Sequence, residues 1–173
     1  MIIQARPGSQ QPWADPARDG RLRRRGAGPG RGAEHLPGTS DRLDLADALT
    51  YLGAVRRLTG DLADAARDLE EGLSIYREIG NRSAETEALN EAGTLYRLRG
   101  DLDRATSCHQ RALDLAREIG IAWDEAHALA GLGSCALAAG RTAEAAGQLP
   151  QALEIFRRIG AAEAAEVAAE LPV

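Results

Sequence analysis

Apolar residues from position 43 onward return at intervals of three and four, the spacing of one face of an α-helix. After Gly60 this stripe consists of Leu62, Ala65, Ala66, Leu69, Leu73 and Tyr76. Gly60 and Gly80 stand where helices are expected to end, and Asp61 and Ser83 are expected to cap the helices that follow. The pattern therefore predicts pairs of helices joined by short turns.

This helix–turn–helix pattern returns every 40 residues. The pair Ile79-Gly80 recurs as Ile119-Gly120 and again as Ile159-Gly160. Residues 41–80 match residues 81–120 at 15 of 40 positions, and residues 81–120 match 121–160 at 11. Such agreement without a gap indicates an internal repeat. We predict an all-α fold built from three units, residues 42–80, 81–120 and 121–160.

Small residues recur at fixed places in each unit. Gly53, Gly93 and Gly133 fall in the middle of the first predicted helix, where Gly costs about 1 kcal/mol relative to Ala. A costly residue kept in three units indicates that two helices approach too closely there for a side chain. The second helices carry small residues at the crossing, namely Ala65, Ala105, Ala145, Gly72, Ala112 and Ala152.

With these residues in place, residues 43–160 resemble the 40-residue class of tetratricopeptide repeat. The motif residues of the second unit are Leu89, Gly93, Tyr96, Ala105 and Ala112. The resemblance implies a right-handed superhelical solenoid of three helix–turn–helix repeats. Residues 161–171 have helical composition and are expected to form a C-terminal capping helix, which completes a domain over residues 42–171.

Two positions depart from the pattern of this repeat class. His109 stands where a large aromatic residue or Leu is usual, and we expect a half-buried helix residue there, not a catalytic base. Pro150 lies inside the second helix of the last unit. A Pro inside a helix costs roughly 3 kcal/mol, so we expect this helix to bend or to be locally loose.

Residues 1–41 differ from the rest of the chain in composition. They are rich in Gly, Pro and Arg without helical spacing, which predicts a disordered tail. Alternatives are an Arg cluster (Arg21, Arg23, Arg24, Arg25 and Arg31) that binds RNA or acidic partners, and a stretch that is not native coding sequence. Residues 42–173 hold 14 Arg against 22 acidic residues, so this part of the chain is a poor candidate for nucleic acid.

The sequence carries no recognisable catalytic or metal motif. It lacks CxxC, HExxH and GxSxG, and the adjacent Cys108 and His109 would point about 100° apart on a helix. We therefore expect no enzyme, no cofactor and no metal site. Two cysteines without a disulfide framework favour a reduced, cytoplasmic setting. Basic residues that are all Arg indicate a GC-rich bacterial genome, and no apolar run is long enough to span a membrane.

Repeats of this class form a concave surface from the first helix of each unit. With the central Gly as a phase marker, the groove residues are expected to be Asp47, Thr50, Ala54, Arg57, Glu87, Asn90, Thr94, Arg97, His127, Ala130, Ser134 and Leu137. The resemblance implies that Asn90 clamps a peptide backbone and that Arg57 and Arg97 pair with its carboxylates. A merely solvated face is the alternative. The apolar third unit is expected to carry either a hydrophobic anchor or a packed neighbour.

These features favour a protein–protein interaction module that binds a peptide or protein segment. The Arg/Ala-rich repeats with an Arg-Glu-Ile-Gly ending (77–80, 117–120) resemble the C-terminal sensor regions of large bacterial transcriptional regulators, SARP-type and NB-ARC-type. Neither a DNA-binding domain nor a Walker motif is present in the sequence, which implies the sensor or scaffold piece alone. A nucleic-acid-binding adaptor acting through the Arg-rich tail is the alternative function, and self-association through the solenoid ends is compatible with both.

Overall fold

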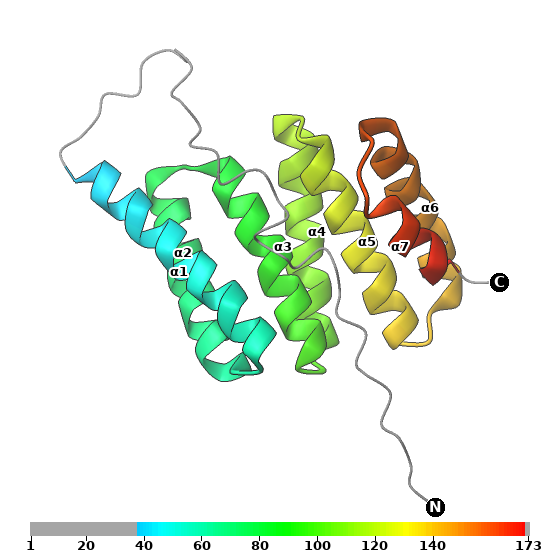
Figure 1. The fold of residues 1–173 in the computed structure, drawn as a ribbon, viewed down its shortest axis with the longest axis horizontal. Helices are drawn as coiled ribbons and strands as arrows, with labels where there is room; N and C mark the ends of the chain where they lie inside the picture. The colour runs from blue at the N-terminus through cyan, green and yellow to red at the C-terminus, as the bar shows by residue number, and fades with distance from the viewer. Residues whose placement is uncertain (1–37, 172–173) are drawn as a thin grey trace, which may run out of the picture. The chain divides into compact units, whose positions relative to one another are not determined.

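A computed structural model describes residues 38–171, and these form seven helices (Figure 1). The helices are α1 (Thr39–Thr59), α2 (Leu62–Ile79), α3 (Arg82–Leu98), α4 (Leu102–Ile119), α5 (Ala122–Ala138), α6 (Thr142–Ile159) and α7 (Ala164–Glu170). Each first helix packs on the second helix of its own unit, and α7 packs on α6. The predicted all-α solenoid of three helix–turn–helix repeats followed by a C-terminal helix is confirmed.

The helix that opens the solenoid begins earlier than the predicted boundary. Helix α1 starts at Thr39, so residues 39–41 belong to the helical repeats and not to the tail. The prediction of disorder for the remainder of residues 1–41 lies outside the described residues.

Glycine ends the helices at a strict interval. Gly60, Gly80, Gly100, Gly120, Gly140 and Gly160 all have positive φ, between 69° and 93°. Gly adopts this left-handed conformation without the penalty that a Cβ imposes, which is why it is the usual residue just past a helix end. At Gly80 the backbone N–H turns back to the carbonyl of Arg77. The predicted helix ends at Gly60 and Gly80 are confirmed.

The predicted helix starts need correction. The cap of α3 is Asn81, whose side-chain oxygen accepts a hydrogen bond from the backbone N–H of Ala84 at 3.2 Å. Ser83 is the second residue of the helix, because the side chain of Asn81 already supplies the cap. Asp61 occupies the cap position of α2 as expected, but its side chain accepts no capping hydrogen bond.

The central glycines mark the closest approach between the two helices of a unit, as the sequence predicted. A Cβ on Gly53 would lie 2.7 Å from Cγ of Leu69, and one on Gly133 would lie 2.5 Å from Cδ2 of Leu149. In the second unit the facing residue is His109, 2.6 Å from such a Cβ on Gly93. Positions 69, 109 and 149 are therefore equivalent and fill the same space in each repeat.

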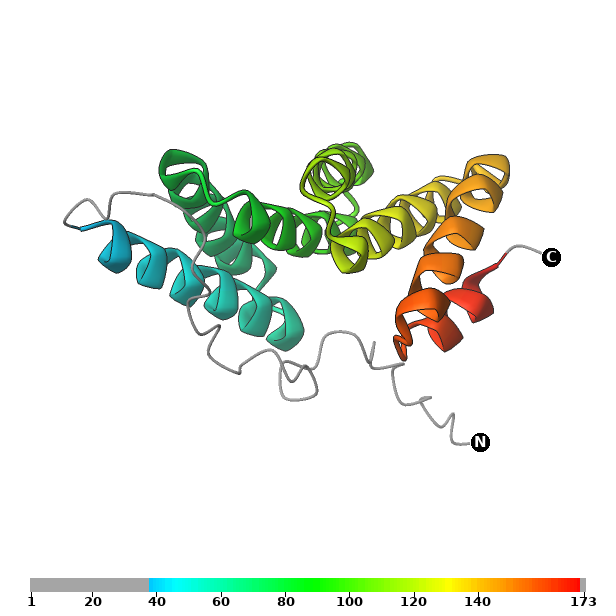
Figure 2. The same cartoon turned by 90° about the horizontal axis from the view of Figure 1, so that it is seen from above.

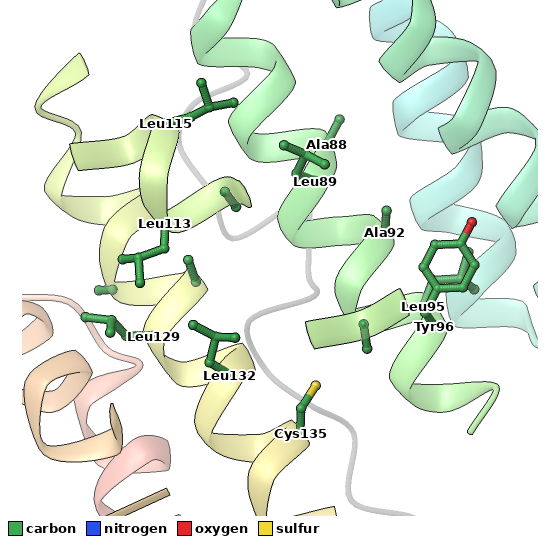
Figure 3. Close-up of a cluster of buried hydrophobic side chains, with 14 of the residues drawn as sticks. Ala88, Leu89, Ala92, Leu95, Tyr96, Leu113, Leu115, Leu129, Leu132 and Cys135 are labelled. Atoms are coloured by element: carbon green, nitrogen blue, oxygen red, sulfur yellow. The ribbon is translucent and has the colours of Figure 1, made fainter. Parts of the chain in front are cut away.

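The core runs without interruption from one repeat to the next. Figure 3 shows the middle of it, where buried side chains from α3, α4 and α5 meet. Helix α3 contributes Ala88, Leu89, Ala92, Leu95 and Tyr96, α4 contributes Leu113 and Leu115, and α5 contributes Leu129, Leu132 and Cys135. Small residues on α3 allow α2 and α4 to pack closely on either side of it.

The first helices also contact one another along the stack. Helix α1 contacts α3, and α3 contacts α5, more extensively than any two second helices contact each other. Seen from above, α3 and α5 lie side by side with α4 behind both of them (Figure 2). The side of α1, α3 and α5 that faces away from the second helices is called the inner face below.

Helix α6 is continuous across Pro150, although a bend or a loose segment was expected there. Pro150 is exposed, and the side-chain amide of Gln151 donates to the carbonyl of Gly147 at 2.5 Å. A Pro removes one backbone donor and crowds the carbonyl groups one turn earlier. The carbonyl that loses its helical donor is that of Ala146, and Ala146 lies on the exposed side of the helix.

Candidate partner-binding face

The inner face begins on α1 with Asp47, whose side chain is exposed. Its carboxylate accepts a hydrogen bond from the hydroxyl of Tyr76 on α2 at 2.7 Å. Burial, together with this carboxylate, raises the pKa of Tyr76 well above its usual value, so the phenol remains a donor. Thr50 is half-buried one turn later, against Gly72. Of the first predicted stripe, Asp47 is therefore the residue that solvent reaches best.

Arg57 does not lie open on the inner face, in contrast to its expected role as an anion contact. Its side chain is only 4% exposed and pairs with the carboxylate of Glu91 on α3 at 3.1 Å. The contact joins one repeat to the next, because the stack brings position 91 of one unit against position 57 of the unit before. The charge of this Arg is neutralised inside the protein.

Asn90, the expected peptide clamp, has its side-chain amide engaged at both ends. Its Nδ2 donates to the backbone carbonyl of Asp124 on α5 at 3.2 Å, and its Oδ1 lies 3.3 Å from Nδ1 of His109. Thr94 is buried, and its hydroxyl donates to the Asn90 carbonyl. Asn90 therefore connects α3 to α4 and α5, and Thr94 is bonded within α3, so neither predicted groove residue presents much to a partner.

His109 is buried, not half-buried as expected, with 1% of its surface exposed. Its ring lies between Gly93 on α3 and Gly131 on α5, since a Cβ on either glycine would be within 2.6 Å of a ring atom. Burial, with a smaller contribution from the Arg97 guanidinium, lowers the pKa of His109 to about 3. The imidazole is therefore neutral, which rules it out as a proton carrier near neutral pH.

Sequence reasoning missed this arrangement, although signals for it exist. His109 stands where the other units have Leu69 and Leu149, and Gly131 appears only in the third unit. A ring between two glycines on adjacent first helices accounts for both departures at once.

The third predicted stripe, His127, Ala130, Ser134 and Leu137, is half-buried throughout. The His127 ring contacts the rings of Trp123 and Phe156, with centroids 4.8 and 5.1 Å away. The Ser134 hydroxyl donates to the Glu170 carboxylate of α7 at 2.7 Å. The end of α7 therefore contacts α5 through this hydrogen bond, while the helix packs mainly on α6.

What remains open on the inner face is acidic. Asp47 and Glu87 are exposed and occupy the same place in successive repeats, 40 residues apart. Arg97, the remaining predicted cation, is half-buried. Because Arg57 is paired internally, the exposed charged residues of the two predicted stripes on α1 and α3 are Asp47 and Glu87.

Neither a metal centre nor a membrane segment is found in this part of the chain. Within residues 38–171, no three His, Cys, Asp or Glu side chains gather in a way that would hold a metal ion. No helix of the same range combines the length and the apolar character needed to cross a bilayer.

Comparison with known proteins identifies the repeats. Two family models described as tetratricopeptide repeat match the chain, one over residues 84–158 and the other over residues 45–79, together 110 of 173 residues. No curated protein matches the sequence.

Solved structures with a similar fold include the apo form of RapI and BtubC (BKLC) from P. vanneervenii. RapI is 17% identical with a TM-score of 0.70 over 76% of this chain. BtubC is 22% identical with a TM-score of 0.50 over 75% of this chain. The chain spans 37% of the length of RapI and 60% of the length of BtubC. At these identities the likeness concerns the fold.

Proposed function

The chain is a tetratricopeptide-repeat protein, a class of protein-interaction scaffold, and we propose that it binds an extended, basic segment of a partner protein along its inner face. The observation that carries the proposal is the pair of exposed carboxylates, Asp47 and Glu87, at equivalent places on adjacent first helices. A side chain repeated at a fixed interval along a solenoid suits a ligand that runs along the same axis.

The spacing of the carboxylates constrains the ligand. Packed helices lie about 8–10 Å apart, and an extended chain advances about 3.3 Å per residue. Asp47 and Glu87 would therefore meet basic residues about three positions apart in the bound segment. Arg57 of α1 and Glu91 of α3 form an ion pair across the same two helices, so they add no net charge to the surface.

The groove roles first expected are assigned differently in this proposal. Asn90 supports the face from below through His109 and Asp124. Arg97 is half-buried at the end of α3, where it is suited to a terminal or side-chain carboxylate of the same partner. His127 and Ser134 hold the packing around α7 and mark the end of the accessible surface.

The test is a pull-down from lysate with the full chain, comparing wild type with an Asp47→Asn, Glu87→Gln double variant. Both substitutions remove charge with little change of shape, and the amide introduced at position 47 retains an oxygen for the Tyr76 hydroxyl. The matched control is Glu71→Gln with Glu154→Gln, two exposed acids on α2 and α6. We expect partners to be lost from the first variant only. Equal recovery of every partner with wild type and both variants would remove the basis for this face.

We further propose that this domain is the sensor or scaffold part of a bacterial transcriptional regulatory system. The support is the resemblance of its repeats, including the Arg-Glu-Ile-Gly endings, to the sensor regions of such regulators. Partners recovered by the pull-down that carry a DNA-binding domain or a nucleotide-binding core would support it. Recovery of partners of neither kind would count against it.

The seven Arg of residues 1–41 favour a second candidate function, a nucleic-acid-binding adaptor. Contacts of Arg with phosphate supply affinity that falls steeply with salt. Deleting residues 1–37 would abolish RNA or DNA binding in this case and leave peptide binding unchanged. Gel-shift assays at two salt concentrations measure the difference.

A further inference from the structure

Helix α1 carries an apolar stripe on the side that a preceding repeat would cover. The stripe consists of Leu45, Ala48, Leu52 and Val55 and is called the α1 stripe below. Leu45 is 48% exposed and Leu52 is 40% exposed, with Tyr51 and Leu58 similarly open beside them. Large apolar side chains gathered on one exposed face mark an interaction surface more often than scattered ones do.

The same positions are buried in the second repeat. One repeat later they are Glu85, Ala88, Ala92 and Leu95, none more than 4% exposed. Helix α2 covers them there, α4 covers the corresponding side of α5, and α6 packs on α7. Among the described first helices, the equivalent side of α3 and of α5 is covered by the second helix of the repeat before it. On α1 this side is left open.

The covering helix differs from the second helix of a repeat. Glu85 accepts from Arg77 of α2 and Glu125 accepts from Arg117 of α4, each at 2.9 Å. The equivalent position on α1 is Leu45, so a covering helix must be apolar there. Residues 1–37 contain five Pro and no apolar stripe of helical spacing, and Pro interrupts helices.

Helix α1 itself has the required pattern. The intervals in the α1 stripe are three, four and three, the spacing with which two helices pack along a seam. Asp41 lies in the first turn of α1, whereas Arg56 in its last turn already pairs with Asp68 of α2 at 2.6 Å. Two α1 helices running in opposite directions would bring opposite ends of their helix dipoles together.

We propose that two copies of this protein associate through their α1 stripes, antiparallel across a two-fold axis near Leu52. A two-fold interface uses the same patch on both copies, and Leu52 lies close to the middle of the exposed apolar residues of α1. A single helix from each copy covers less than the roughly 800 Å² per partner of a standard interface, so the dimer is weak and reversible. The inner face is not used and stays open to a partner.

The experiment is light scattering on the full chain at protein concentrations from about 1 to 300 µM, which span weak association. We expect the mass of wild type to rise from 18.3 kDa toward twice that value. Leu52→Glu and Leu52→Arg should each remain monomeric, because a like charge faces itself across the axis. An equimolar mixture of the two should associate again, because opposite charges then face each other.

Leu98→Glu is the matched control, since Leu98 is a similarly exposed Leu on α3 outside the stripe. It should associate as wild type does, and circular dichroism should show the same helix content for every variant. A wild type that is monomeric over the whole range overturns the proposal. Association that survives Leu52→Glu, or a mixture of the Glu and Arg variants that stays monomeric, overturns the two-fold pairing.

Discussion

At the scale of single residues, His109 shows how one substitution in a repeat reorganises its neighbours. Leu69 and Leu149 fill the equivalent space with apolar atoms, whereas His109 brings two ring nitrogens into the core. Nδ1 meets the Asn90 amide at 3.3 Å, and Nε2 is buried with no hydrogen-bond partner. Burying a polar atom without a partner costs about 1–3 kcal/mol, so this position trades stability for the contact with Asn90.

Replacing His109 with Leu should therefore raise the free energy of unfolding by about 1 kcal/mol at pH 7. The larger effect is on pH dependence. His109 has a pKa of about 3 in the folded protein against about 6.5 in the unfolded chain. Between these values the unfolded state binds more protons, so the stability that neutral His109 contributes is present above pH 6.5 and is lost as the pH falls toward 3.

Urea unfolding at pH 7 and pH 5 measures this difference. Between the two pH values wild type should lose about 2 kcal/mol more than His109→Leu does, because the carboxylates common to both proteins cancel in the comparison. Parallel losses in the two proteins would mean that His109 accepts a proton in the folded state and that its ring is less enclosed than its contacts with Gly93 and Gly131 indicate.

At the scale of helices, the packing of α5 on α6 depends on a Gly inside α5, although Gly has a low intrinsic preference for helix. Gly133 is inside α5, and a Cβ there would lie 2.5 Å from Cδ2 of Leu149. Gly147 is inside α6, and a Cβ there would have no neighbour within 4 Å. Both residues are Gly and have the same intrinsic helix preference. A difference between substitutions at the two positions therefore measures the effect of packing alone.

Substitution by Ala should consequently have opposite signs at the two positions. Gly133→Ala should lower the free energy of unfolding by about 1–3 kcal/mol, because the added methyl group overpacks the crossing. Gly147→Ala should raise it by about 0.5–1 kcal/mol, because Ala is the better helix former. Chemical denaturation of both variants against wild type measures the pair. Stabilisation by Gly133→Ala would contradict the close approach of α5 and α6.

At the scale of the whole molecule, the 40-residue period was enough to predict the all-α solenoid, its helix ends and its close helix crossings. Contacts between repeats could not be predicted in the same way. Arg57 meets Glu91, and Asn90 meets His109 and Asp124, across separations that depend on how one unit is rotated against the next. A helical wheel shows which residues share a face, but α3 and α5 are each covered on two sides by second helices, so only a narrow strip of that face stays exposed.

Helix α7 shows the same stacking at the C-terminal end and permits a test of it. It follows α6 as the first helix of a further repeat would, starts 42 residues after the start of α5, and buries Val167 against the last repeat, chiefly on α6. Fully burying a Val contributes about 1.5–3 kcal/mol. Ending the chain at Gly160 removes this contact, removes the Ser134–Glu170 hydrogen bond and uncovers part of the α5–α6 pair.

We expect the shortened chain to lose about 2–3 kcal/mol of unfolding free energy, and Val167→Ala to lose a smaller amount. Because each repeat contacts only its neighbours, the loss should be local. Amide hydrogen exchange followed by mass spectrometry should show faster exchange in α5 and α6 and little change in α1 and α2. A control chain that ends at Leu171 keeps α7 and should behave as wild type. Equal acceleration of exchange in all helices would mean that the repeats unfold as one cooperative unit and that α7 stabilises the whole stack.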